Sequence, residues 1–267
     1  MENWIEEQVA RNSRGFDAAM VNENPDANDY TRDPERYFER VCLECNYLDA
    51  VKTLDWAALI PPGARVLDLA GGTGWLTAFL SSMANVREIT IVDASHSYLV
   101  NNLPVAVRRL GGDAQKIKSA VGYFSPLLFD DASLDLVVVS SSLHHADCLE
   151  SVLKEIHRVL VPGGRCLILN EAPVGDLFYL RMMIVTFIRS LASTLSRRYV
   201  ALSPSLSGSG ILYDPVLGDR MFPRWYWARA IDAAGFRLAE VVDTKLPTVK
   251  NGDGIPLVHF VCAKPAG

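Results

Sequence analysis

The 267-residue chain lacks the excess of basic residues that nucleic-acid-binding proteins usually display. It has 26 Lys and Arg against 31 Asp and Glu, for a formal net charge of −5, whereas a protein that binds phosphate backbones normally presents a basic surface. It also lacks a positively charged segment followed by an apolar run near Met1, so no signal peptide is expected. We therefore predict a cytoplasmic protein that binds no nucleic acid.

Cysteine is scarce, with five residues and no pattern of a disulfide framework. Cys42 and Cys45 form a single C-x-x-C pair, and no second pair follows at the spacing of zinc ligands. Half-buried helical thiols explain this pair better than redox or metal chemistry does, so we predict no metal site. Hydrophobic residues make up 49% of the chain, enough for one sizeable core.

The third glycine of a dinucleotide-binding turn is also missing. The apolar run Val66-Leu67-Asp68-Leu69 leads through glycines to Gly74 and then into a helical pattern. The usual fingerprint is G-x-G-x-x-G, but Gly72 and Gly74 are followed by Thr77. The acid at position 68 would repel a pyrophosphate and attract an ammonium group. A ligand with a cationic amino-acid end and an adenosine end, such as S-adenosylmethionine, fits this turn better than NAD.

The stretch Val66 to Thr77 resembles the first motif of class I S-adenosylmethionine-dependent methyltransferases. Its wording, Asp-Leu-Ala-Gly-Gly-Thr-Gly, is similar to that of the ubiquinone and menaquinone C-methyltransferases. The resemblance covers 63–170 and includes Asp93, 129–139, Leu143-His144-His145 and 153–165. It implies an α/β fold with a doubly wound, seven-stranded, mostly parallel sheet whose last strand is antiparallel. It also implies bound S-adenosylmethionine and a product S-adenosylhomocysteine.

Turn signals and apolar runs divide the chain into four stretches. We predict an N-terminal helical cap at 1–62, a cofactor-binding core at 63–170, a lid insertion after the fifth strand at 171–222, and a C-terminal completion of the sheet at 223–267. Strands are expected at 65–69, 88–92, 120–124, 134–139, 166–170, 236–242 and 257–263, and helices at 34–59, 75–80 and 223–234.

Asp93 ends the second apolar run, where an acid can accept both ribose hydroxyls of an adenosine. The alternative is a helix cap for the residues that follow. Relatives commonly place an acid against the adenine amino group, but Tyr123 stands at that place here; Gly112-Asp113-Ala114 is an alternative register. The expected cofactor contacts are Asp68, Ala70, Gly71, Gly72, Thr73, Gly74, Asp93, Ala94, Tyr123, Phe124, Ser140 and Ser141.

His144 and His145 follow the fourth strand of the resemblance, close to where the methyl group would be presented. Histidine titrates near neutrality and can remove a proton from an acceptor. Both histidines are therefore catalytic candidates. The alternative is that the pair only shapes the loop and the methionine pocket.

The lid insertion should decide which acceptor binds. Its apolar stretch 177–189 is interrupted by Arg181 and Arg189, so we expect no stable membrane span, and either a buried lid helix or a membrane-surface helix. Aromatic and apolar residues near the lid suit an apolar or aromatic small molecule. The substrate-binding candidates are Tyr30, Phe178, Met182, Phe222 and Trp225, and Tyr47 is a candidate to close over the cofactor.

These residues predict methyl transfer to a small molecule, with oxygen as the first choice of acceptor atom because a base is present, followed by nitrogen or carbon. Three alternatives remain open: a cyclisation or elimination that uses S-adenosylmethionine structurally, a NAD(P)-dependent oxidoreductase, and a non-catalytic cofactor-binding partner. The oligomeric state is not predicted.

Overall fold

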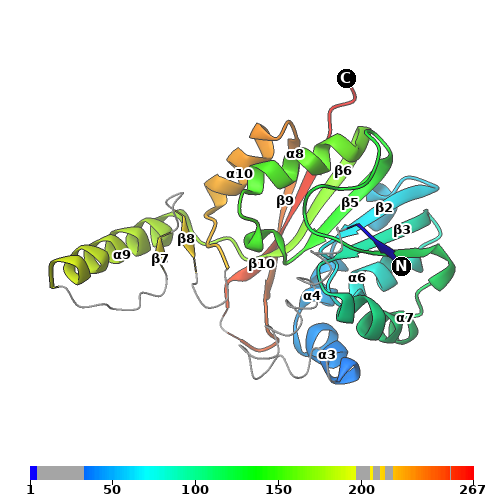
Figure 1. Ribbon diagram of the computed structural model, residues 1–267, viewed down its shortest axis with the longest axis horizontal. Coiled ribbons are helices and arrows are strands. Elements are labelled where there is room, and N and C mark those ends of the chain that lie inside the picture. The colour runs from blue at the N-terminus through cyan, green and yellow to red at the C-terminus, as the bar shows by residue number, and fades with distance from the viewer. Residues whose placement is uncertain (5–32, 197–204, 207–210, 214–218, 253) are drawn as a thin grey trace.

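An eight-stranded sheet forms the centre of the computed structural model, which describes residues 1–4, 33–196, 205–206, 211–213, 219–252 and 254–267 (Figure 1). The strands lie in the order β1-β4-β3-β2-β5-β6-β10-β9. All neighbours from β1 to β6 are parallel, and β10 runs antiparallel to both β6 and β9, as predicted. Their bounds are β1 Glu2–Asn3, β2 Ala64–Leu69, β3 Val86–Asp93, β4 Ile117–Val121, β5 Leu134–Ser140, β6 Leu160–Glu171, β9 Arg237–Pro247 and β10 Pro256–Ala263.

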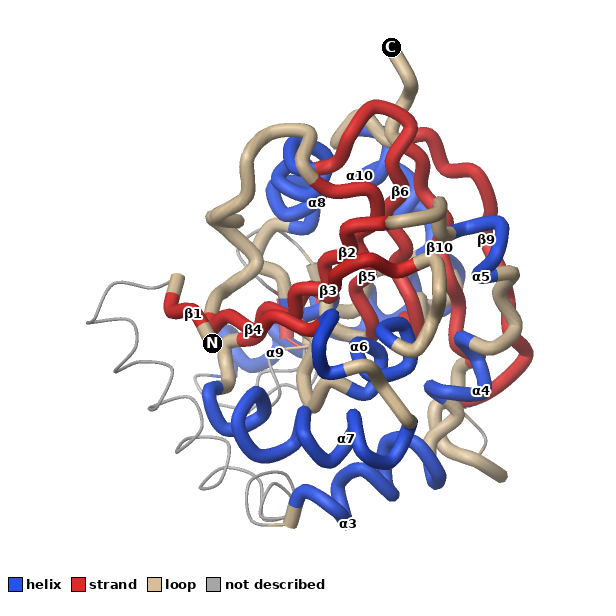
Figure 2. The backbone as a smooth tube through the Cα atoms, turned by 90° about the vertical axis from the view of Figure 1, so that its right-hand side faces the viewer, coloured by secondary structure: helices blue, strands red, loops and turns tan. Residues whose placement is uncertain are grey.

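The central strands are apolar along their length because helices cover both faces of the sheet. Alternate residues of β2 and β5 enter two separate cores. Leu67 and Val137 pack with α8 (Leu149–Val159) and α10 (Arg224–Ala233), whereas Val66 and Leu136 pack with the helices of the other face. Those helices are α3 Pro34–Glu39, α4 Tyr47–Val51, α5 Trp56–Leu59, α6 Trp75–Ser81 and α7 Leu103–Leu110. Figure 2 shows α7 and α3 on the opposite side from α8 and α10.

The direction of the strand order changes between β2 and β5. From β2 the chain proceeds outward through β3 and β4, and from β5 it proceeds the other way through β6. In open parallel sheets, ligands bind outside the carboxyl ends of the strands at such a switch point. The turn after β2 and the loop after β5 are therefore the place to look for a site.

Three details differ from the sequence-based expectations. The sheet has eight strands and not seven, because Glu2 and Asn3 pair with Ala120 and Val121; the N-terminal stretch is thus not wholly helical. The strand expected at 120–124 is β4, which ends at Val121 because the chain turns out of the sheet there, next to the end of β3.

The stretch 34–59, predicted as one or two helices, is divided into shorter pieces. A π-helical turn at Arg40–Glu44 separates α3 from α4, and α5 follows after another turn. The break at Asn46 has a tertiary cause: its side-chain amide donates to the Pro247 carbonyl oxygen, at the end of β9, over 2.7 Å. Sequence periodicity alone does not report such a contact.

The lid insertion begins where β6 ends. It contains α9 (Asp176–Ser196) and the short pair β7 (Ser205–Leu206) and β8 (Leu212–Tyr213). Val174, Tyr179 and Leu212 form a small core with the methionines beside them. Figure 1 shows α9 projecting away from the sheet. The division into four domains stays a prediction.

His259 on β10 ties the N-terminal cap to the sheet. Its imidazole is fully buried; Nδ1 accepts the backbone N–H of Asn170 over 3.0 Å, and Nε2 donates to the carbonyl oxygen of Ala50 over the same distance. Burial lowers the pKa of this histidine, which agrees with a neutral ring that donates from Nε2.

We predict that His259→Ala lowers the free energy of unfolding by about 3 kcal/mol, because it leaves one buried N–H and one buried C=O without partners and opens a cavity. Urea unfolding at neutral pH measures this change. His96→Ala is the matched control, since His96 is exposed, and should change stability by less than about 0.5 kcal/mol. Equal effects of the two variants would contradict the assignment.

Candidate active site

The turn after β2 depends on left-handed backbone conformations. Ala70, Gly72 and Gly74 have φ values of +52°, +54° and +77°, a region that favours glycine. A Cβ on Gly74 would collide with Leu103, whereas a Cβ on Gly72 would meet no atom within 4 Å. The turn is therefore packed on its inner side and faces open space at Gly72, where a ligand can approach the main chain.

Asp93 connects the end of β3 to this turn. Its Oδ2 accepts the backbone N–H of Gly72 and its Oδ1 accepts that of Ser95, both over 2.8 Å. These two bonds fix the Asp93 carboxylate at the carboxyl end of β3, beside the glycine turn. The helix that follows begins at His96, and the Ser95 hydroxyl accepts the backbone N–H of Tyr98 over 3.1 Å, so Ser95 and not Asp93 caps it.

Asp68 is buried beneath the turn and exposes no surface. Its Oδ2 accepts the hydroxyl of Thr77 over 2.6 Å, and its Oδ1 has no hydrogen-bond partner among the described residues. Burial, together with the nearby Asp93, raises its pKa to about 7, although the Thr77 hydrogen bond works against this. The contact of Asp68 with a ligand ammonium stays a prediction, and the buried Oδ1 is the oxygen that could make it.

The two candidate adenine contacts follow β4. Tyr123 is 41% exposed, and Phe124 packs on the core through part of its ring. The alternative adenine contact, Asp113, lies in the turn before β4, where it accepts the backbone N–H of Gln115. This turn is at the amino end of β4, away from the glycine turn at the carboxyl end of β2, so Asp113 does not adjoin the proposed cofactor site. Thr73 and Ala94 are in the turns after β2 and β3, beside the contacts already described.

Serines after β5 hold the loop in place. The hydroxyl of Ser142 lies 2.7 Å from the Ser140 carbonyl oxygen and 3.2 Å from that of Ala70, so its one proton is shared between this loop and the glycine turn. Ser140 Oγ accepts the side-chain amide of Asn170, and the Ser141 hydroxyl lies 3.2 Å from that of Tyr47. Ser140 and Ser141 therefore have protein partners of their own, and Tyr47 reaches the site from the N-terminal cap.

A buried carboxylate, which the sequence analysis missed, orients His144. Glu171 ends β6 and is 2% exposed. Its Oε1 accepts the backbone N–H groups of Ser142 and Leu143 over 3.1 and 3.0 Å, and its Oε2 lies 2.9 Å from His144 Nδ1. Burial acts to lower the pKa of His144, but Glu171 and Asp219 outweigh it, and the pKa is raised above its usual value.

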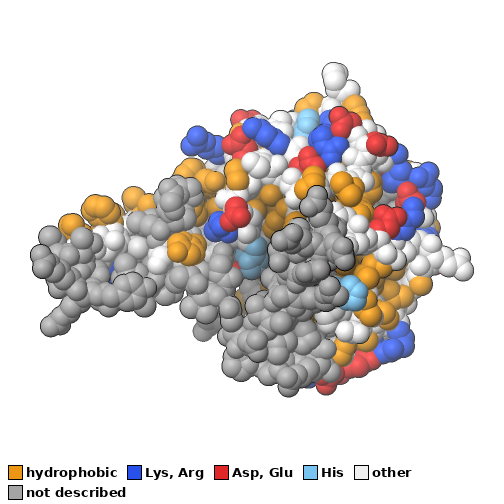
Figure 3. Space-filling view, in the orientation of Figure 1, with side chains coloured by type: hydrophobic (Ala, Val, Ile, Leu, Met, Phe, Trp, Pro, Cys, Tyr) orange, Lys and Arg blue, Asp and Glu red, His pale blue; other side chains and the backbone are white. Residues whose placement is uncertain are grey.

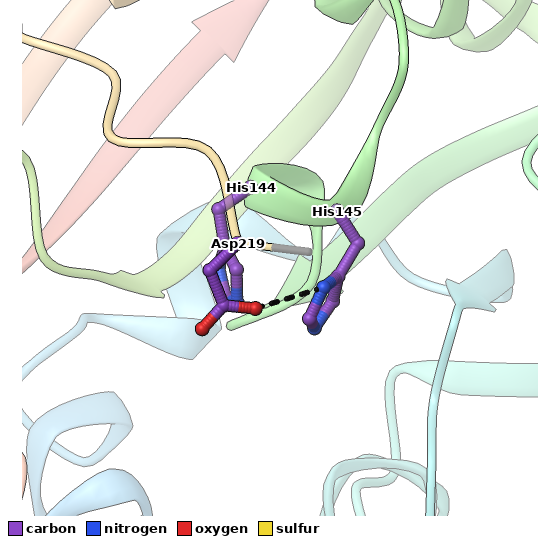
Figure 4. Close-up of side chains that lie close together, drawn as sticks. All are labelled: His144, His145 and Asp219. Carbon is purple, nitrogen blue, oxygen red and sulfur yellow. Dashed lines mark ion pairs between the residues drawn. The ribbon is translucent and has the colours of Figure 1, made fainter. Parts of the chain in front are cut away.

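His145 faces the lid. Its Nδ1 lies 3.1 Å from Asp219 Oδ1, and His144 Nε2 lies 3.9 Å from the same oxygen (Figure 4). Arg220 fixes this part of the lid, since its backbone N–H donates to the His144 carbonyl oxygen and its guanidinium to that of His145. The two histidines lower the pKa of Asp219 against the opposing effect of burial. One ligand atom from each of these three residues lies within 4.8 Å of the others, close enough to hold a metal ion.

The substrate-binding candidates do not gather at one place. Phe222 is buried and packs against Trp227 with ring centroids 5.5 Å apart, so it is part of the core. Met182 packs in the small core of the lid, while Phe178 and Trp225 are exposed on two different helices. Tyr30 lies outside the described residues.

Comparison with known proteins identifies the family and the fold. A methyltransferase-domain family model matches residues 67–168. The chain is 38% identical over 210 residues to the ubiquinone/menaquinone biosynthesis C-methyltransferase UbiE of Rubrivivax gelatinosus, covering 77% of this chain and 74% of the relative. The chain is a class I S-adenosylmethionine-dependent methyltransferase related to UbiE.

Other similarities to this methyltransferase are shorter or more distant. The UbiE of Ectopseudomonas mendocina is 34% identical over 119 residues, 44% of this chain and 45% of the relative. A 1,6-didemethyltoxoflavin-N1-methyltransferase of Burkholderia thailandensis, solved with its substrate and S-adenosylhomocysteine, superposes with a TM-score of 0.56 at 19% identity, covering 93% of this chain and 88% of that one. The [4+2]-cyclase SpnF superposes with a TM-score of 0.55 at 16% identity, covering 78% and 77%. These two structures share the fold.

The described residues fit S-adenosylmethionine. The open space over Gly72 would receive the ligand beside the main chain, and the Asp93 carboxylate, held next to this turn, is the acceptor predicted for the ribose. The loop after β5 adjoins the same turn through Ser142. The cofactor would therefore lie across the carboxyl ends of β2, β3 and β5.

We predict that Asp93→Asn weakens the binding of S-adenosylhomocysteine about 30-fold, because a hydrogen bond to a charged acceptor contributes about 2 kcal/mol. Isothermal titration calorimetry measures the dissociation constant. Asp113→Asn is the control, because Asp113 lies at the amino end of β4. This variant should bind S-adenosylhomocysteine with the affinity of the wild type. Unchanged affinity in Asp93→Asn would show that this carboxylate does not hold the ribose.

Proposed function

We propose that this methyltransferase transfers the methyl group to a hydroxyl oxygen of a small apolar or aromatic molecule, with His144 as the general base. The observation that carries the proposal is the contact of His144 Nδ1 with the buried Glu171, in a loop that is hydrogen-bonded to the glycine turn. An imidazole held by one nitrogen presents its other nitrogen in a fixed direction. The same arrangement is known from other general bases oriented by a carboxylate.

When bound, S-adenosylmethionine supplies an electrophilic methyl group on a sulfonium sulfur. The residues of this chain act on the acceptor. With Nδ1–H donated to Glu171, the lone pair of His144 Nε2 is free to accept the hydroxyl proton as the oxygen forms its new bond to carbon. Glu171 stabilises the imidazolium that results, and the proton then leaves to solvent.

The preference for a hydroxyl-bearing acceptor over an amine rests on the presence of this base. A neutral amine can attack a methyl group through its lone pair, but a phenol or enol becomes a good nucleophile only after it loses a proton. The deprotonated form can then react at oxygen or at a ring carbon, and the Rubrivivax gelatinosus relative is named a C-methyltransferase. The proposed base serves either outcome, and we place oxygen first.

The function is tested with cofactor that carries a labelled methyl group and a panel of phenols, enols and amines. Label is expected in a methyl ether, and NMR of the product distinguishes ether from C-methyl. A chelator should leave the rate unchanged, since the base, and no metal at His144, His145 and Asp219, is proposed to activate the acceptor. A product that forms without label transfer would instead indicate cyclisation or elimination with the cofactor in a structural role.

Glu171→Gln tests the base through the pH dependence of the rate. A base works in its deprotonated form, so the wild-type rate should rise with pH through the raised pKa of His144. Removing the negative charge favours the neutral imidazole, so the rise should move to lower pH, and the plateau should fall about tenfold as ring orientation is lost. His144→Ala should lower the rate of methyl transfer about 100-fold at all pH values.

Glu150→Gln is the matched control, because Glu150 is a partly exposed acid paired with Lys154 on α8. Its pH profile should coincide with that of the wild type. A Glu171→Gln profile whose rise stays in place would mean that His144 is not the group that titrates.

A further inference from the structure

An exposed apolar stripe runs along α9. Six side chains at spacings of one, three or four residues are each between 50% and 83% exposed: Leu177, Leu180, Ile184, Phe187, Ile188 and Leu191. Such spacings put residues on one face of a helix. The stripe is about 21 Å long, at 1.5 Å for each residue. Apolar side chains along the upper edge of the projecting part are visible in Figure 3.

The opposite face of α9 is already used. Tyr179 and Thr186 are buried, and Met182 and Met183 pack against the small core of the lid. The buried residues therefore account for how α9 is attached, and they leave the stripe without a protein partner among the described residues. A lid that buried its apolar face over a substrate would show the reverse orientation.

The charges on α9 indicate what covers the stripe. Arg181 and Arg189 are exposed, and after Asp176 the helix has no acidic residue. The chain as a whole carries a net charge of −5, whereas α9, with two arginines and Asp176, carries +1. A second copy of α9 would bring arginines against arginines, whereas helices that pair usually place opposite charges beside the apolar seam. Lipid phosphates would neutralise both arginines.

We propose that α9 lies on the surface of an anionic lipid bilayer, with the apolar stripe in the interface and Arg181 and Arg189 among the lipid phosphates. Helices with one apolar face and basic residues beside it bind membranes in this way. None of the helices in the described part of the chain has the length and hydropathy that crossing a membrane requires. Since α9 begins five residues after Glu171, the bound membrane would lie close to the active site.

Vesicle flotation with the full chain tests the proposal and requires no methyl transfer. The protein should float with vesicles of mixed phosphatidylcholine and phosphatidylglycerol, and less with phosphatidylcholine alone. Leu180→Glu/Ile184→Glu should reduce the binding at least about tenfold, because two apolar contacts are replaced by anions. Arg181→Gln/Arg189→Gln should weaken binding to anionic vesicles by about fivefold for each arginine. Its binding to phosphatidylcholine vesicles should not change.

Leu128→Glu is the matched control, since Leu128 is also exposed but lies in a loop far from α9 in the sequence; it should float like the wild type. Thermal stabilisation by S-adenosylhomocysteine verifies that each variant is folded, and the arginine variants change only exposed side chains. Wild-type protein that stays out of the vesicle fraction would overturn the proposal. So would light scattering that shows a dimer abolished by the glutamate variants without any flotation, which would identify a second copy as the partner.

Discussion

The geometry of the active site depends on one buried carboxylate. Glu171 accepts two backbone N–H groups of the loop after β5 and the Nδ1 of His144, and it is almost inaccessible to solvent. Each of these donors would lack a partner if the carboxylate were absent, and an unmade buried hydrogen bond costs about 1–3 kcal/mol. The position of the histidine relative to the glycine turn is therefore built into the end of β6.

Two further hydrogen bonds bring the strand ends together. Asp93 holds the turn after β2 through Gly72, and Ser142 joins the loop after β5 to Ala70. The turn proposed to hold the methyl donor and the proposed base His144 are consequently parts of one connected arrangement across β2, β3, β5 and β6. This connection explains how a cofactor bound at the turn and an acceptor beside His144 can be aligned for an in-line displacement.

The sequence was sufficient to predict the parallel core, because strands that are buried on both faces consist of near-continuous runs of apolar residues. It could not predict β1, since Glu2 and Asn3 carry no such pattern. Glu171 was missed because an acid that follows an apolar run is equally typical of the start of a surface loop. Asp219 was missed because it is brought next to the histidines only by the tertiary fold. Phe222 was predicted to bind substrate, but an aromatic residue beside a lid is equally suited to the core.

The protonation of His144 in solution is the most direct test of this account. Long-range nitrogen–proton NMR of the histidine rings distinguishes which nitrogen carries the proton when the ring is neutral. The contact with Glu171 predicts a proton on Nδ1 and a free Nε2, and Glu171→Gln should alter the Nδ1 signal of this ring. A neutral His144 with its proton on Nε2 would contradict the account, because that nitrogen could then not accept a proton from the methyl acceptor.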